Sequence, residues 1–163
     1  MKIFRRILVP HDFSEAATHA FRVAIQLARQ HGGRLTVLHV VTPYQPVTEL
    51  PEVAGWISDA EIVKGTRRSL DDLVRRELRG RGAPRTRFDV QLGNPVTRIL
   101  AAAKEADCVV MATEGRTGLA HLMIGSVAEK VVRLSPIPVL TVRPPQARTG
   151  RARARRMARQ RGK

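Results

Sequence analysis

The chain has 163 residues, of which 43% are hydrophobic and only 4% aromatic, and its formal net charge is +15. This length suits one domain with a sizeable core, and the scarcity of aromatic side chains argues against a protein that binds nucleic acid by stacking bases. Its single cysteine, Cys108, excludes an intramolecular disulfide framework and a multi-cysteine metal site. Because Cys108 stands in an apolar run, we expect a buried, structural thiol in a cytosolic protein.

The basic charge is unevenly distributed along the chain. Residues 144–163 hold eight arginines or lysines and no acidic residue, which leaves a net charge of +7 for residues 1–143. We therefore expect one folded domain over residues 1–143 and a disordered, arginine-rich tail over residues 144–163, because apolar anchors are too few to offset the entropy of ordering. The tail could also hold nucleic acid or another anionic surface nonspecifically.

Several common signals are absent from the sequence. No apolar run approaches the roughly 20 residues that span a bilayer, and the opening MKIFRRILVPHDF reaches Pro10 and Asp12 too soon for a signal peptide. We expect a cytoplasmic protein without membrane insertion. The motifs G-x4-G-K-[ST], G-x-S-x-G and H-E-x-x-H are also missing, which argues against an ordinary hydrolase.

Short apolar runs alternate with helical patterns along residues 1–143. Asp12 or Ser14 can cap the first helix, Gly32 and Gly33 end it, and three prolines mark residues 42–58 as a long irregular excursion. The expected elements are strand 7–9, helix 16–30, strand 34–41, helix 59–79, strand 86–92, helix 96–106, strand 108–113, helix 125–134 and strand 138–143.

This strict alternation predicts an α/β fold: a doubly wound, five-stranded parallel sheet with helices on both faces. With the strands ordered 3-2-1-4-5, the winding direction reverses between the first and fourth strands. Ligands bind beyond the carboxyl ends of strands at such a point. The first strand ends at residues 10–12 and the fourth at residues 111–113, so both chain segments should border a crevice.

The segments ILVPHDFSEAA, LTVLHVV and GNPVTRILAAAKEADCVVMATEGRTGLAHLMIGSVAEKVVRLSPIPVLTVR resemble the universal stress protein family across residues 3–143. The resemblance implies the sheet order given above, in a Rossmann-like fold of the adenine nucleotide alpha hydrolase type. It also implies that the chain is related to the nucleotide-binding branch of the family, whose members carry a G-x2-G-x9-G-[ST] signature for ATP.

This chain departs from that signature at one position. Gly125 and Ser126 match the final pair, Gly115 matches the second glycine, and Ala112 stands in place of the first. If the first glycine needs positive φ or very close ligand approach, Ala112 would weaken binding; if the position needs only a small residue, little changes. The sequence favours the second interpretation.

The resemblance places adenine and ribose beside Asp12 and Val40, and phosphates near the start of the fourth helix, where unpaired amides and the helix dipole favour an anion. The cofactor would be ATP, with Mg²⁺ or Arg116 screening Glu114 from the triphosphate. The implied site residues are Pro10, His11, Asp12, Val40, Met111, Ala112, Gly115, Arg116, Gly125 and Ser126.

Each of these signals has a plainer interpretation. Ser126 and Glu129 fit a capping box without any ligand, and Asp12 could merely cap the first helix. His11 and His39 lack a second carboxylate cluster, so we predict no metal site. The last strand, Pro138 to Val142, should be an edge that in the family commonly pairs across a homodimer.

Two functional hypotheses follow. The first is a cytoplasmic, dimeric universal stress protein that binds ATP or another adenine nucleotide as a regulatory switch in the stress response; without a well-placed catalytic base it would be at most a slow ATPase. The alternative is a nucleotide-independent interaction protein of the same fold, associated with nucleic acid or an anionic surface through its basic tail.

Overall fold

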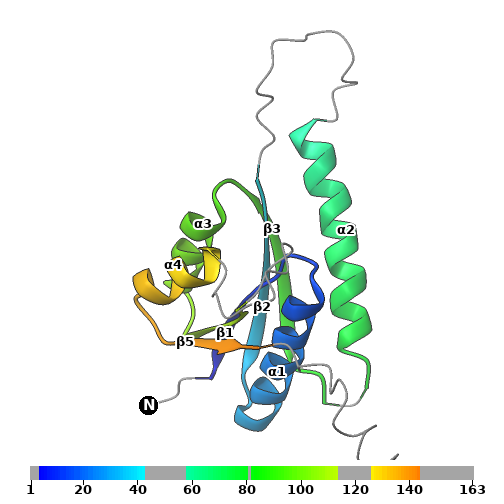
Figure 1. The fold of residues 1–163 in the computed structure, drawn as a ribbon. Coiled ribbons are helices and arrows are strands. Elements are labelled where there is room, and N and C mark those ends of the chain that lie inside the picture. Colours follow the sequence, from blue (N-terminus) through cyan, green and yellow to red (C-terminus); the bar gives the residue numbers. More distant parts are fainter. Residues whose placement is uncertain (1–3, 43–57, 81, 114–125, 144–163) are drawn as a thin grey trace, which may run out of the picture.

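The computed structural model describes residues 4–42, 58–80, 82–113 and 126–143. Within them five strands form one parallel sheet in the order β3-β2-β1-β4-β5, with four helices on its two faces (Figure 1), which confirms the predicted fold and strand order. The elements are β1 (Arg6–Pro10), α1 (Glu15–His31), β2 (Arg34–Val41), α2 (Asp59–Glu77), β3 (Arg85–Leu92), α3 (Pro95–Ala103), β4 (Cys108–Ala112), α4 (Ser126–Leu134) and β5 (Val139–Val142).

The buried side chains fall into two apolar layers, one on each face of the sheet. Ile7 and Val9 of β1 pack with residues of α1 and α2, whereas Leu8 between them packs with residues of α3 and α4. This alternation follows from the two-residue period of a strand and explains why the run is apolar throughout. Cys108 is buried as predicted, and burial raises the pKa of its thiol to about 11.

The first helix begins and ends at the residues that the sequence marks. The Ser14 hydroxyl oxygen accepts a hydrogen bond from the amide of Ala17 at 3.1 Å, so Ser14 is the N-cap. At the other end Gly32 adopts φ +61° and its amide donates to the carbonyl of Ala28, a left-handed C-cap that glycine adopts without strain.

The third helix differs from its expected bounds. It starts at Pro95, capped by the side chain of Asn94, because proline suits a first helical position that needs no amide donor. It ends at Ala103 instead of Ala106. The amides from Lys104 to Ala106 donate to carbonyls three residues back, so this last turn tightens and no longer counts as α-helix.

The backbone pairing of β1 ends at different points on its two sides. The pairing of β1 with β2 continues as far as Pro10 opposite Leu38, but its pairing with β4 stops at Leu8 opposite Val109. Pro10 has no amide hydrogen to give to a neighbouring strand. The pairing with β4 therefore ends before the carboxyl end of β1. The crevice expected between residues 10–12 and 111–113 stays a prediction, because the cavity that the structure describes is lined by Asp12 but by no residue of 111–113.

Candidate functional site

The loop that follows β1 carries a carboxylate on a short, internally bonded turn. Asp12 Oδ1 accepts a hydrogen bond from the Ser14 amide at 3.0 Å, which is an Asx turn, and the His11 amide donates to the Leu38 carbonyl at 2.9 Å. Because Ser14 caps α1, Asp12 is not the helix cap, and one of the two roles left open by the sequence falls away. The turn fixes Asp12 beside the end of β2.

Phe13 holds this loop in a strained conformation. Its φ is +66°, which is rare for a bulky side chain and costs on the order of 1–3 kcal/mol. The Phe13 amide donates to His11 Nδ1 at 3.0 Å, and its ring lies 4.7 Å from the His39 ring between centroids. Strain of this kind persists where the surroundings impose it, and it clusters at binding sites.

His11 imposes that conformation from inside the fold. Its side chain is 3% exposed, and since Nδ1 accepts the Phe13 amide hydrogen, the imidazole is neutral with its hydrogen on Nε2, 3.3 Å from the Thr18 hydroxyl. Burial lowers the pKa of His11 to about 4, partly opposed by the negative charge of Asp12. His11 therefore positions the loop as a neutral acceptor at ordinary pH.

His39 joins the loop to β2. Its Nδ1 lies 2.7 Å from the His11 carbonyl oxygen, and because a carbonyl only accepts, Nδ1 carries the hydrogen. His39 is buried and packs under the Phe13 ring. The two histidines are thus structural members of one hydrogen-bonded unit, and among the described residues no group of three or more His, Cys, Asp or Glu is placed to hold a metal ion.

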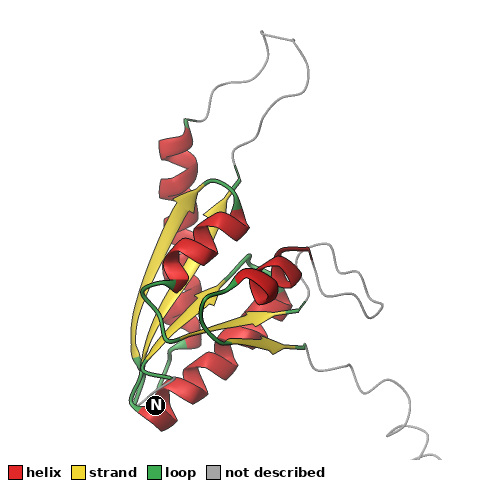
Figure 2. Ribbon diagram, turned by 90° about the vertical axis from the view of Figure 1, so that its left-hand side faces the viewer, coloured by secondary structure: helices red, strands yellow, loops and turns green. Residues whose placement is uncertain are grey.

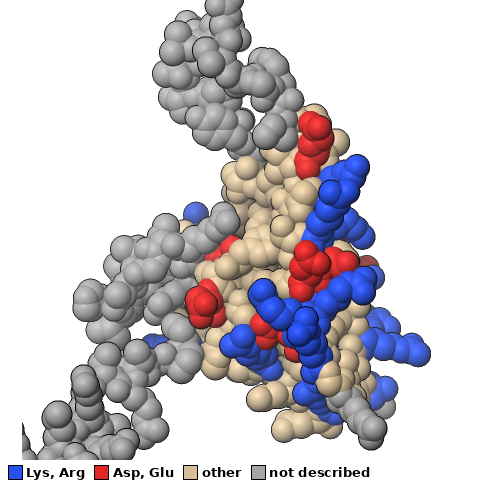
Figure 3. Space-filling view, turned by 90° about the vertical axis from the view of Figure 1, so that its right-hand side faces the viewer, with Lys and Arg blue, Asp and Glu red and all other residues tan. Residues whose placement is uncertain are grey.

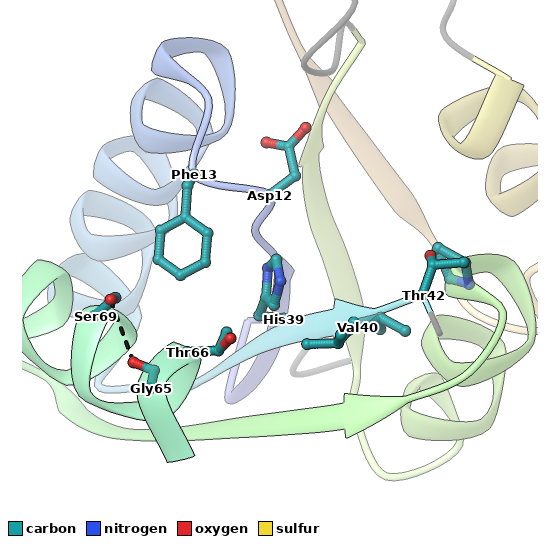
Figure 4. Close-up of a pocket in the computed structure, with 10 residues that line it drawn as sticks. Asp12, Phe13, His39, Val40, Thr42, Gly65, Thr66 and Ser69 are labelled. Atoms are coloured by element: carbon teal, nitrogen blue, oxygen red, sulfur yellow. Dashed lines mark hydrogen bonds between the residues drawn. The ribbon is translucent and has the colours of Figure 1, made fainter. Parts of the chain in front are cut away.

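A cavity of about 810 Å³ opens beside this unit, between the ends of β1 and β2, helix α2 and the start of α3 (Figure 4). Asp12 and Phe13 border it from the loop, and Thr66 and Ser69 border it from α2, where the Ser69 hydroxyl donates to the Gly65 carbonyl oxygen at 3.3 Å. A methyl group added at Gly65 would meet no atom within 4 Å, so there is open space beside this residue. The lining residues are Asp12, Phe13, His39, Val40, Val41, Thr42, Gly65, Thr66, Ser69 and Pro95.

The structure brings two of the predicted site residues, Asp12 and Val40, into the wall of this cavity. Pro10 and His11 lie directly behind it, at the end of β1 and under Phe13, and Met111 is buried in the layer of α3 and α4. Ser126 is the first residue of α4 and is exposed. Gly115, Arg116 and Gly125 lie outside the described residues.

The structure answers one question about Ala112. This residue is the last of β4, pairs with Val142, and is not among the described residues with positive φ. Its methyl group is buried against Ala16 and Ala20 of α1. The position therefore does not need the conformational freedom of glycine, and the methyl group fits an apolar contact.

The predicted site residues include only two of the ten residues that line the cavity. Phe13 is not among the predicted site residues, because no pattern in the sequence indicates its positive φ. Thr66 and Ser69 come from α2, and their place depends on how this helix packs on the sheet, which periodicity does not specify. Pro95 carried a signal as a turn residue, and Thr42 follows β2 directly.

A model of the universal stress protein family matches residues 3–143, and the chain therefore belongs to this family. A universal stress protein of Thermus aquaticus is 35% identical over 143 residues, which cover 86% of this chain and 100% of the relative. One from Methanocaldococcus jannaschii is 30% identical over 146 residues, 88% and 85% of the two chains.

Solved structures of the family share the fold. The UspA protein of Lactobacillus plantarum has a TM-score of 0.68 and 26% identity, covering 86% of this chain and 98% of its own. A universal stress protein solved in complex with cAMP has a TM-score of 0.60 at 23% identity, covering 85% and 96%. One from Archaeoglobus fulgidus, solved in complex with dAMP, has a TM-score of 0.57 at 22% identity, covering 85% and 98%. Within the described part of our chain, no helix is both long and apolar enough to cross a membrane.

Proposed function

We propose that this chain binds ATP or another adenine nucleotide at the carboxyl ends of β1, β2 and β4, and that occupancy acts as a regulatory switch in the stress response. The observation that carries the proposal is the cavity whose wall joins the Asp12 carboxylate to the aliphatic surface of Val40 and Val41. A wall that combines apolar and polar side chains suits a nucleoside, whose base has apolar faces and whose sugar carries hydroxyl groups. The complexes of relatives with cAMP and dAMP support the ligand class.

Each part of the nucleotide has a chemical match in the proposed site. Val40 and Val41 offer apolar contact to adenine, and the Phe13 ring offers an aromatic edge or face. A carboxylate such as that of Asp12 only accepts hydrogen bonds, so a ribose hydroxyl is a suitable donor to it. The strained, internally bonded loop presents that carboxylate without further ordering, which reduces the entropic cost of binding.

The phosphates would meet Gly115, Arg116, Gly125 and Ser126. Ser126 opens α4, and the amides and dipole at a helix start favour an anion. Mg²⁺ would accompany ATP and screen its charge. Ala112 lies in the extended strand with its methyl group against α1, which supports the proposal that this position of the family signature needs only a small residue.

We also propose a homodimer through the last strand, Pro138 to Val142. In the sheet order β5 is an edge, and Leu140 on it is 39% exposed. Val132 and Leu134 of α4 are 45% and 54% exposed, which adds apolar surface on the neighbouring element. A second copy pairing along β5 would cover this edge.

The role of Asp12 can be tested by a cycle that changes protein and ligand separately. We expect Asp12→Ala to weaken ATP binding to nucleotide-stripped protein by roughly 10- to 100-fold, the effect of a lost hydrogen bond to a charged group. For dideoxy-ATP, which lacks both ribose hydroxyls, wild type and Asp12→Ala should bind equally weakly. Isothermal calorimetry of the four combinations gives the coupling.

If Asp12→Ala weakened the binding of ATP and of dideoxy-ATP by the same factor, Asp12 would not contact the ribose. Its role would then be limited to holding the conformation of the loop. Asp12→Asn is the matched control, since its amide oxygen can still accept the Ser14 amide while the charge is gone. This variant should melt like wild type and bind ATP with intermediate affinity.

A further inference from the structure

A cluster of arginines occupies the amino-terminal halves of β2 and β3, at the far end of the strands from the cavity. Leu38 and Val40 of β2 pack in the layer of α3 and α4, so Arg34 and Thr36, at even spacing from them, face the same side. The parallel register places Arg85 opposite Arg34 and Arg87 opposite Thr36. We name Arg34, Arg85 and Arg87 the arginine face.

The arginine face is open to solvent. Helix α3 packs on β1 and β2, and its contacts with β2 fall on the carboxyl half, where Leu38 and Val40 lie. All three arginines are exposed. In Figure 2 the long strands run beyond the end of α3, and the lower halves of their ribbons have no helix in front of them.

The positive charge of this face is only partly compensated within the described residues, by the one carboxylate of Asp89. None of their ion pairs involves Arg34, Arg85 or Arg87, whereas Arg6, next in the same row on β1, is bound by Asp107 at 2.7 Å. The only acidic residue of β2 or β3 is Asp89, which accepts a hydrogen bond from Gln91 at 2.8 Å.

Some of the arginines of α1 and α2 differ in this respect. Arg22 pairs with Glu77 at 2.7 Å, and Arg75 pairs with Asp71 at 2.8 Å. Figure 3 shows this side of the molecule, where acidic side chains lie among the basic ones. The arginine face thus stands out by arrangement and not only by the basic composition of the chain.

The arrangement carries an energetic cost that an anion would remove. Arg34 and Arg85 are directly opposite each other on strands about 4.8 Å apart, and like charges in this position destabilise a sheet. Arg87 is held at the face by its Nε, which donates to the Thr36 hydroxyl at 3.0 Å. Its remaining guanidinium hydrogens are available for a second acceptor.

We infer that the arginine face binds the phosphate backbone of a nucleic acid without reading its sequence. Arg85 and Arg87 repeat along one strand at about 6.6 Å and Arg34 adds a second row, so the face offers several guanidinium groups to a repeating polyanion. Thr36, Asp89 and Gln91 complete the face, and none is aromatic or aliphatic. Base stacking and insertion into a lipid layer therefore both lack the necessary side chains.

This inference is independent of the proposed nucleotide site, because the two lie at opposite ends of the same strands. It also differs from binding through the basic tail, since the three arginines belong to the folded sheet. Both contributions can be separated in the full chain by leaving the tail unchanged in every variant.

The test compares two full-length triple variants with the same loss of charge. The first is Arg34→Gln, Arg85→Gln and Arg87→Gln; the control is Arg68→Gln, Arg76→Gln and Arg79→Gln, three exposed arginines on or directly after α2. Fluorescence anisotropy with a short DNA duplex of random sequence, repeated over a range of salt concentrations, gives affinity and salt slope.

We expect the first variant to bind about tenfold more weakly at low salt and to lower the slope of log K against log salt by about 2 to 3, close to 0.9 per phosphate contact. The control should change the slope by less than half as much. Equal losses in the two variants, no loss in either, or binding to anionic vesicles without binding to the duplex would each overturn the inference. If the triple variant melts abnormally, Arg87→Gln alone should still lower the slope by about 0.9.

Discussion

The free energy of unfolding should be about 2 kcal/mol lower at pH 5 than at pH 7.5 because of one side chain, His11. Its pKa is about 4 in the folded protein and near 6.5 when unfolded, so between these values the unfolded chain binds the additional proton. The contribution of His11 to the free energy of unfolding is therefore fully present above pH 6.5 and is lost as the pH falls toward 4. Over this whole pH range the loss from His11 is about 3 kcal/mol, at about 1.4 kcal/mol per pKa unit.

Asp12, His39 and Glu77 lie close enough to influence the charge of His11. The hydrogen bond from Arg22 lowers the pKa of Glu77 from its ordinary value of 4.5, so this carboxylate adds to the loss of stability only as the pH approaches that value. The change between pH 7.5 and 5 therefore reports on His11. Urea unfolding at a series of pH values measures the slope directly.

The matched variant is His11→Asn, whose amide oxygen can still accept the Phe13 amide but which does not titrate. It should be less stable than wild type at pH 7.5, because it loses ring packing, and it should lose the slope between pH 6.5 and 5. A variant that retains the full slope would assign the pH dependence to other groups and contradict the neutral, buried His11.

Gly33→Ala should destabilise the fold by about 3 kcal/mol, which corresponds to a fall of roughly 6–12 °C in Tm. A methyl group at Gly33 would lie 2.1 Å from the Phe4 carbonyl oxygen, a backbone atom that cannot rotate away. The Gly33 amide donates to Ala28 and the Arg34 amide donates to Arg5, both at 2.8 Å. The clash therefore moves the start of β2 against two fixed hydrogen bonds.

Gly32→Ala separates this clash from the general cost of replacing glycine. Gly32 has φ +61°, but its nearest neighbour is the flexible end of Arg5 at 3.4 Å, so alanine there should cost about 1–2 kcal/mol. Thermal and urea unfolding of both variants provide the comparison. Equal destabilisation of the two would mean that the contact with Phe4 relaxes without cost.

The fold was predictable because its signals are local and repeated. The apolar run 7–9 and the alternation of short strands with longer helices specify a parallel sheet, and Ser14 and Gly32 mark the ends of α1 through backbone chemistry that does not depend on distant residues. The predicted end of α3 lies three residues beyond the observed one, because the tightening of the last turn does not change the spacing of the apolar residues.

The site was predictable only where it follows from the ends of strands. Asp12 and Val40 stand at the ends of β1 and β2, so their meeting in one cavity follows from topology. Phe13 was not predictable, because its conformation depends on the acceptor of a buried His11. Thr66 and Ser69 depend on the packing of α2, and the role of Ala112 became clear only from its contact with α1.

The most direct test of the central claim is a calorimetric titration of nucleotide-stripped protein with ATP and Mg²⁺, beside the variant Gly125→Asp. This variant places a carboxylate where the family signature expects phosphate. Binding in the micromolar range that Gly125→Asp loses, with normal melting of both proteins, is the result that a nucleotide switch predicts. No heat from either correctly folded protein would contradict it and leave the loop from Ala112 to Ser126 as a connection between β4 and α4.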